Sequence, residues 1–190
     1  MKDLHQKVLF TLVELGRAPT SSEIAEVLGE GNIDESLRRL GADDLIVLDG
    51  ETRLPAGAYP VTIESTPHLI LVNGNTIHAM CALDALSVAP MFDATVVIDS
   101  VCHVLKTPIR IHMQASNITE VQPSTDITVG IRWQNPSAVA AHSLCMEMIF
   151  LEDRKIAETW QGGDTDNISL YTLSEAVEFG EAFFLPLLKR

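Results

Sequence analysis

Cysteine is scarce in this sequence, and its arrangement excludes two common cysteine frameworks. The 190 residues include only three cysteines, which are Cys81, Cys102 and Cys145. Their number is odd and no two have C-x-x-C spacing, so we expect neither a disulfide framework nor a zinc site of four cysteines from one chain. Reduced thiols remain, and thiolate chemistry is the function class that they allow.

Basic residues are also few. Lys and Arg total 13 against 26 for Asp and Glu, which gives a net charge of −13 and a pI near 4.7. Proteins bind nucleic acids and anionic membranes through basic surfaces, because the phosphate charges must be neutralised. The charge balance therefore argues against a nucleic-acid partner and against a membrane partner.

Long apolar runs are absent as well. No apolar stretch approaches the roughly 18 residues that span a bilayer, and residues 1–6 lack the order of a signal peptide. We therefore expect a cytoplasmic protein. The hydrophobic fraction of 46% is ordinary for a globular protein, so the chain can form a core.

Residues 1–60 have the pattern of three short helices followed by a β-hairpin. Apolar residues recur at helical spacing, and the second and third helices begin at the predicted caps Thr20 and Asn32. Asp49-Gly50 between two extended runs is typical of a hairpin turn. This order predicts a winged-helix-like module.

Winged helices commonly bind DNA, but the charges of this module do not favour it. The third predicted helix offers only Arg38 and Arg39 as cations. Four acidic residues surround them, namely Asp34, Glu35, Asp43 and Asp44. Because such a surface repels phosphate, we interpret the module as a packing domain.

Residues 61–190 predict a core of mostly antiparallel strands with flanking helices. A turn-rich stretch from Pro55 to Pro67 marks the boundary between the two domains. Strands are expected at 68–72, 76–78, 94–102, 108–113, 127–133, 142–151 and 170–171. A loop is expected at 153–163, a turn or helix start at 135–137, and a capped final helix after Thr172. The predicted fold class is α+β.

The stretch Met80–Leu86 places a thiol and a carboxylate three residues apart in a run that predicts a helix. Residues at i and i+3 project from one face of a helix, so Cys81 and Asp84 are expected to point into one small volume. On these two residues alone, a buried structural cysteine near an exposed carboxylate is the more frequent arrangement.

The other two cysteines differ in their predicted surroundings. Cys102 shares a strand face with the apolar Val96, which indicates a structural role. Cys145 lies off the apolar face of its predicted strand, beside Glu147, and is the better candidate for reactivity. If this strand packs against the helix of Cys81, two thiols and one carboxylate converge.

Such a set of groups has a definite chemistry. Two thiolates favour a soft, thiophilic metal ion in linear or trigonal coordination. A nearby carboxylate can accept a thiol proton and later deliver a proton to a leaving group, provided that burial raises its pKa. The set suits cleavage of a bond between carbon and a soft metal, and it suits zinc poorly because a closed zinc site requires four ligands.

Five short motifs then point to a known family. They are Cys81-Ala82-Leu83-Asp84, Ser100-Val101-Cys102, Ser143-Leu144-Cys145, Trp160-Gln161-Gly162 and Ser174-Glu175-Ala176. In this order they resemble the organomercurial (alkylmercury) lyases, over roughly residues 60–190. That family also carries a winged-helix-like N-terminal module, although the sequence match there is weaker.

The resemblance implies a role for each residue. Cys81 and Cys145 match the two thiols that capture the mercury of R–Hg⁺. Asp84 matches the carboxylate that accepts a thiol proton and then protonates the departing carbanion, and Cys102 matches a structural cysteine. The products are then R–H and Hg(II), with no cofactor. Small cellular thiols accept the Hg(II) and, in a complete resistance pathway, pass it to a mercuric reductase.

The sequence departs from the family pattern beside these residues. Met80 stands where an aromatic residue, often Trp, is expected, and His78 replaces a further aromatic residue. Met146 follows Cys145 where a second cysteine often occurs. These changes leave the three reacting groups in place and alter the pocket wall.

Two other functions are compatible with the cysteines. The first is a non-catalytic protein or sensor that binds Hg(II) or Cu(I), which leaves Asp84 without a role. The second is a hydrolase with Cys145 or Cys81 as nucleophile and His103 or His142 as base. The hydrolase ranks lower, because no nucleophile-elbow glycine pattern accompanies either cysteine.

Overall fold

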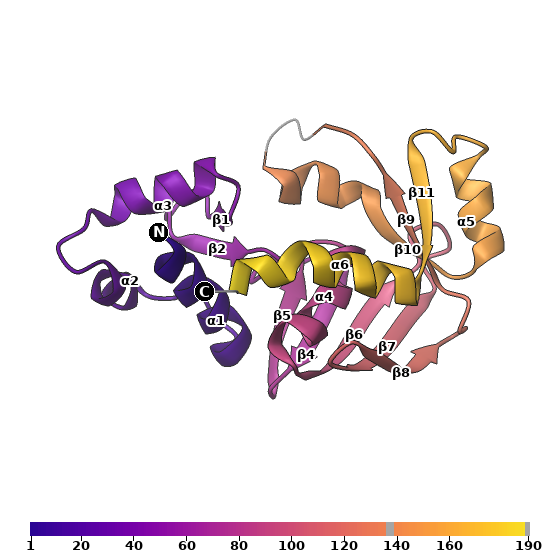
Figure 1. Cartoon of the computed structure of the whole chain (residues 1–190), viewed down its shortest axis with the longest axis horizontal. Coiled ribbons are helices and arrows are strands. Elements are labelled where there is room, and N and C mark those ends of the chain that lie inside the picture. The colour runs from indigo at the N-terminus through magenta and orange to yellow at the C-terminus, as the bar shows by residue number, and fades with distance from the viewer. Residues whose placement is uncertain (136–138, 189–190) are drawn as a thin grey trace.

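The first part of the chain has three helices and a hairpin, in the predicted order (Figure 1). The computed structural model describes residues 1–135 and 139–188. The elements of this part are α1 (Lys2–Leu15), α2 (Ser21–Leu28), α3 (Ile33–Ala42), β1 (Ile46–Leu48) and β2 (Pro55–Ala58). Thr20 and Glu23 form the expected capping box of α2, and the side chain of Asn32 caps α3.

Two antiparallel sheets form the rest of the architecture. The larger has the strand order β1-β2-β3-β5-β4-β6-β7-β8, and the smaller has the order β10-β9-β11. The remaining strands of the larger sheet are β3 (Val61–Thr62), β4 (His68–Val72), β5 (Asn75–Ala79), β6 (Thr95–Val101), β7 (Pro108–Gln114) and β8 (Asn117–Gln122). The smaller sheet contains β9 (Thr128–Arg132), β10 (Met148–Leu151) and β11 (Ile168–Thr172). The predicted α+β class with mainly antiparallel strands is confirmed.

The larger sheet continues across the predicted domain boundary. β2 lies within the stretch expected to be turn-rich, and it pairs with β3, which in turn pairs with β5. Helix α1 packs against all three of these strands. The two predicted domains therefore share one sheet. Their division between residues 60 and 61 stays a prediction, as does the winged-helix assignment.

Helix α4 (Ala82–Phe92) lies at the centre of the molecule, and α6 (Leu173–Leu188) runs over it (Figure 1). Every residue of α4 from Ala82 to Ala89 is buried. Gly180 permits the close approach of the two helices, because a Cβ atom there would collide with the Oγ of Ser87. No helix within the described ranges is long and apolar enough to cross a membrane.

The prediction of one strand over residues 142–151 is wrong for its first six residues. Two 3₁₀ turns, η1 (Ala140–His142) and η2 (Leu144–Glu147), come before the short strand β10. The pairing of β10 with β9 begins only at Met148, opposite Ile131. The residues before Met148 therefore have no strand partner on β9, although their apolar and polar residues alternate as in a strand.

The prediction of a loop at residues 153–163 is also wrong, because most of this stretch forms the helix α5 (Arg154–Gln161). The side chain of Asp153 caps this helix by accepting a hydrogen bond of 2.7 Å from the backbone N–H of Ile156. This helix is only eight residues long and buries only Ala157, so it depends on packing against β9. The turn expected at 135–137 lies mostly outside the described residues.

Candidate active site

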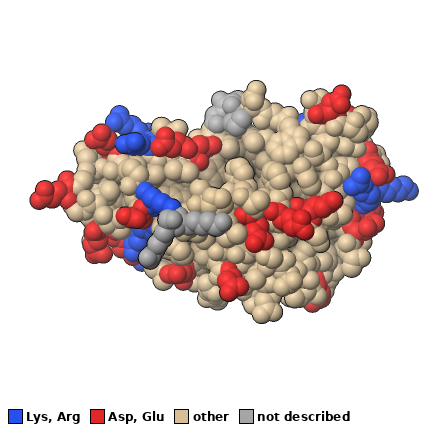
Figure 2. All heavy atoms as spheres, in the orientation of Figure 1, with Lys and Arg blue, Asp and Glu red and all other residues tan. Residues whose placement is uncertain are grey.

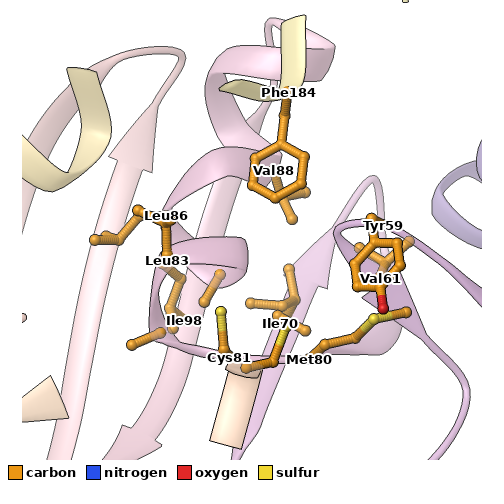
Figure 3. Packing of buried hydrophobic residues seen from close by; sticks show 14 of the residues in the cluster. Tyr59, Val61, Ile70, Met80, Cys81, Leu83, Leu86, Val88, Ile98 and Phe184 are labelled. Atoms are coloured by element: carbon orange, nitrogen blue, oxygen red, sulfur yellow. The ribbon is translucent and has the colours of Figure 1, made fainter. Parts of the chain in front are cut away.

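Cys81 lies at the N-cap of α4, so the predicted helix begins one residue after it. Its Sγ accepts a hydrogen bond of 3.3 Å from the backbone N–H of Asp84 and lies 3.6 Å from the Sδ of Met148. Figure 3 shows the thiol among apolar core side chains. Because the N-terminus of a helix stabilises negative charge, this position favours the thiolate form when a soft cation binds.

Asp84 lies in the first turn of α4 and is only 1% exposed. The alternative of a structural cysteine near an exposed carboxylate therefore does not hold for Asp84. Burial raises the pKa of this carboxyl group to about 7, although hydrogen bonds with Cys81 and Cys145 oppose the shift. The group can thus accept and release a proton near neutral pH.

Cys145 reaches the same point from η2. Its Sγ donates a long hydrogen bond of 3.8 Å to the Oδ2 of Asp84. The two thiol sulfurs and a carboxylate oxygen of Asp84 lie within 4.8 Å of one another, and all three residues are buried. Burial, Cys145 and Asp84 together raise the pKa of the Cys81 thiol. The structure therefore brings the three predicted residues together around one point.

The turn before Cys145 is fixed by two side chains from the first 60 residues. The carboxylate of Asp44 accepts a hydrogen bond of 3.1 Å from the backbone N–H of Ala140. The hydroxyl of Tyr59 accepts one of 2.8 Å from the N–H of Ala141 and donates one of 3.0 Å to Asp44. Burial raises the pKa of Tyr59, which keeps the phenol protonated. These contacts favour the 3₁₀ turn η1, which directly precedes the turn η2 that contains Cys145.

Two cavities meet at Cys145. One, the histidine-lined cavity, encloses about 370 Å³. Its wall includes Glu64, His68, Met80, His103, Lys106, His142 and Met146. The other, the aromatic cavity, encloses about 360 Å³. Its wall includes Leu83, Trp133, Leu144, Phe179, Phe183, Phe184 and Leu187. Cys145 lines both cavities, whereas Asp84 lines the aromatic cavity alone.

The remaining candidates from the sequence lie apart from this cluster. Cys102 is buried at the end of β6, and its Sγ accepts a hydrogen bond from the backbone N–H of Leu105. His103 and His142 line the histidine-lined cavity. Within the described ranges, neither imidazole has a hydrogen bond to a thiol, and His142 lies instead 3.5 Å from the carboxylate of Glu64. This geometry does not favour the hydrolase.

A family model described as alkylmercury lyase matches residues 61–185, which is more than half of the chain. The chain belongs to the alkylmercury lyase family. The alkylmercury lyase of Bacillus cereus is 27% identical over 152 residues, which cover 80% of this chain and 68% of that relative. The alkylmercury lyase of Staphylococcus epidermidis is 27% identical over 180 residues, or 95% of this chain and 81% of that relative.

Comparison with solved structures shows the same fold. The crystal structure of the mercury-bound form of MerB2 matches with a TM-score of 0.83 and 22% identity, over 99% of this chain and 91% of that one. The family match and the curated relatives make the chain an alkylmercury lyase, an enzyme that cleaves the carbon–mercury bond of organomercurials.

Sequence reasoning missed two groups of residues around the site. The roles of Asp44 and Tyr59 could not be predicted, because their contacts with η1 join residues that are 82 or more positions apart in the sequence. The aromatic wall that α6 contributes to the aromatic cavity was not predicted either, and its residue Phe183 is 63% exposed. The signal available in the sequence was the adjacent pair Phe183-Phe184, because neighbouring residues on a helix point in different directions and the two rings cannot both face the same part of the core.

Proposed function

We propose that Cys81, Asp84 and Cys145 are the catalytic residues of this alkylmercury lyase. The observation that supports the assignment is the convergence of both sulfurs and the carboxylate within 4.8 Å. A mercury ion held by two thiolates fits the soft donor set. The mercury is part of the substrate and then of a product, and no resident cofactor is required.

The proposed reaction uses the protons that these groups already hold. A thiol gives its proton to the Asp84 carboxylate as its sulfur bonds to the mercury of R–Hg–X, and X leaves. The second thiol then releases its proton to the solvent, where it balances the charge of X, and its sulfur binds the mercury and weakens the bond from mercury to carbon. Asp84 protonates the carbon as that bond breaks. Two thiol protons are released in total, one into R–H and one with X, and Hg(II) stays on the two sulfurs.

Product release then depends on small thiols. Both sulfurs are buried, so Hg(II) leaves by ligand exchange with an incoming thiolate rather than as a free ion. A reduced, thiol-rich cytoplasm supplies such thiols and also keeps the cysteines reduced. A mercuric reductase is the expected next acceptor of the Hg(II).

The N-terminal module acts in this proposal as a packing domain. Its side chains Asp44 and Tyr59 hold the turn η1, which directly precedes the turn that contains Cys145. Figure 2 shows acidic side chains in a row across the middle of the molecule, where Figure 1 shows α6. The exposed residues of α6 include Glu175 and Glu178. We expect no retardation of duplex DNA and no binding to anionic vesicles at low salt. Binding to either at micromolar protein would contradict this role.

The test of the catalytic residues is the formation of benzene. Purified protein is incubated with phenylmercury and excess small thiol, and benzene is measured by gas chromatography. We expect benzene from the native chain and none from Cys81→Ser, Cys145→Ser or Asp84→Asn, with Cys102→Ser as the matched active control. Full benzene production by Asp84→Asn would remove Asp84 from the mechanism. Hg(II) binding without benzene in the native chain would indicate a soft-metal binder.

A further inference from the structure

Asp84 opens onto only one of the two cavities that meet at Cys145. The aromatic cavity includes Asp84 in its wall, and the histidine-lined cavity does not. A proton passes directly only between atoms within hydrogen-bond reach. If Asp84 protonates the carbon that leaves mercury, that carbon lies on the side of the aromatic cavity. This step rests on the proposed role of Asp84.

We propose that the aromatic cavity, between α4, η2 and α6, is the binding site for the organic group of the substrate, and that it favours aryl over methyl mercurials. Its volume of about 360 Å³ exceeds the need of a methyl group. A methyl group leaves most of the apolar wall without contacts. A phenyl ring contacts more of the wall and buries more of its own apolar surface away from water.

The aromatic wall is arranged to receive a ring. The ring centroids of Phe179 and Phe183 lie 6.5 Å apart with nearly parallel planes. Phe184 meets Phe183 edge to face at 4.8 Å, and Trp133 meets Phe179 at 6.2 Å. Aromatic pairs prefer offset-stacked and edge-to-face geometries, and a bound phenyl ring can adopt either one against this wall.

The substrate can reach the aromatic cavity from the solvent at Phe183. Phe183 is 63% exposed although it lines the cavity. An apolar group can therefore enter past this ring and reach Asp84 and Cys145 at the inner end. The histidine-lined cavity also reaches Cys145 but does not include Asp84 in its wall, so the polar groups of that cavity do not line the proposed site of the organic group.

Two variants with equal exposure separate the two cavities. Phe183 and Met146 are each 63% exposed, and they line the aromatic and the histidine-lined cavity respectively. The measured quantity is the ratio of kcat/KM for phenylmercury to kcat/KM for methylmercury. We expect Phe183→Ala to lower this ratio by about tenfold and Met146→Ala to leave it unchanged. Leu187→Trp, which narrows the aromatic cavity, should lower the ratio further while methylmercury is still cleaved.

A crystal structure of Asp84→Asn with phenylmercury provides the second measurement. We expect the ring beside Phe183 and Phe184. A ring beside His68 and His103, or a ratio that responds to Met146→Ala and not to Phe183→Ala, would overturn the aromatic site while leaving the lyase residues in place. Loss of the ring from the crystal by cleavage would instead show that Asp84 is not the proton donor, so the two failures are distinguishable.

Discussion

The hydroxyl of Tyr59 accepts a hydrogen bond of 2.8 Å from the backbone N–H of Ala141, a residue 82 positions further along the chain. This single contact joins β2–β3 of the larger sheet to the 3₁₀ turn before Cys145. Because both residues are buried, water does not replace the bond when the hydroxyl is removed. The position of one candidate catalytic sulfur thus depends on a phenol in the first part of the chain.

Replacement of Tyr59 by Phe should therefore reduce both stability and turnover. An unpaired buried N–H costs about 1–3 kcal/mol of unfolding free energy. A displaced Cys145 lowers kcat for phenylmercury. Urea unfolding and steady-state kinetics measure the two effects. Tyr171→Phe is the control, and an equal loss of kcat in that variant would contradict a positioning role for Tyr59.

The raised pKa of Asp84 predicts a specific pH dependence of stability. The folded carboxyl group has a pKa of about 7 against an ordinary value of 3.8. Between these values the folded state binds more protons than the unfolded state, so the unfolding free energy falls as pH rises. Relative to Asp84→Asn, the native chain should lose roughly 4 kcal/mol between pH 4 and pH 8. Urea unfolding of both proteins at each pH measures this difference, and a constant difference would contradict it.

The same group should set the acid limb of the reaction. In the free enzyme the Asp84 carboxylate accepts the first thiol proton, so its protonated form is inactive in that step. We expect kcat/KM for phenylmercury to be low in acid and to rise with pH, with a midpoint at about pH 7. The profile is measured with benzene release at fixed ionic strength. A limb near the ordinary carboxyl pKa would show that burial does not control the group.

Cys102 provides a test of the structural assignment. Its buried Sγ accepts a hydrogen bond from Leu105, away from the other two thiols. Cys102→Ala should reduce the unfolding free energy by on the order of 1 kcal/mol through lost packing and this weak bond. Benzene production should stay within about twofold of the native rate. Loss of activity at unchanged stability would give Cys102 a part in the reaction.

The contact between Gly180 and Ser87 should control how closely α6 sits on α4. A methyl group in Gly180→Ala collides with the Ser87 Oγ, which should cost about 1–3 kcal/mol and raise KM for phenylmercury by moving the aromatic wall. The added change Ser87→Ala removes the colliding atom. The double variant should therefore recover part of both losses. No recovery in thermal unfolding or KM would mean that the helices do not meet as described.

The sequence predicted local features well where a short pattern determines them. The caps at Thr20 and Asn32 were predicted from residues within three positions. The pairing of Cys81 with Asp84 was predicted for the same reason. These features depend on neighbours in sequence, so they could be read without knowledge of the fold.

The failures share a different physical cause. The alternating residues before Met148 fit a strand, but β9 offers no partner there. Distant side chains fix the turn η1 just ahead of these residues. The cavities depend on the packing of α6 against α4, which no local pattern encodes. Long-range hydrogen bonds and helix packing thus decided the parts of the site that sequence reasoning missed.

Four residues of the aromatic wall lie on one face of α6. They are Phe179, Phe183, Phe184 and Leu187. None of the three candidate catalytic residues belongs to this helix. A library randomised at these four positions would therefore sample organic-group preference without touching the bond-breaking chemistry, and a lineage exposed to new mercurials could diversify through the same short segment.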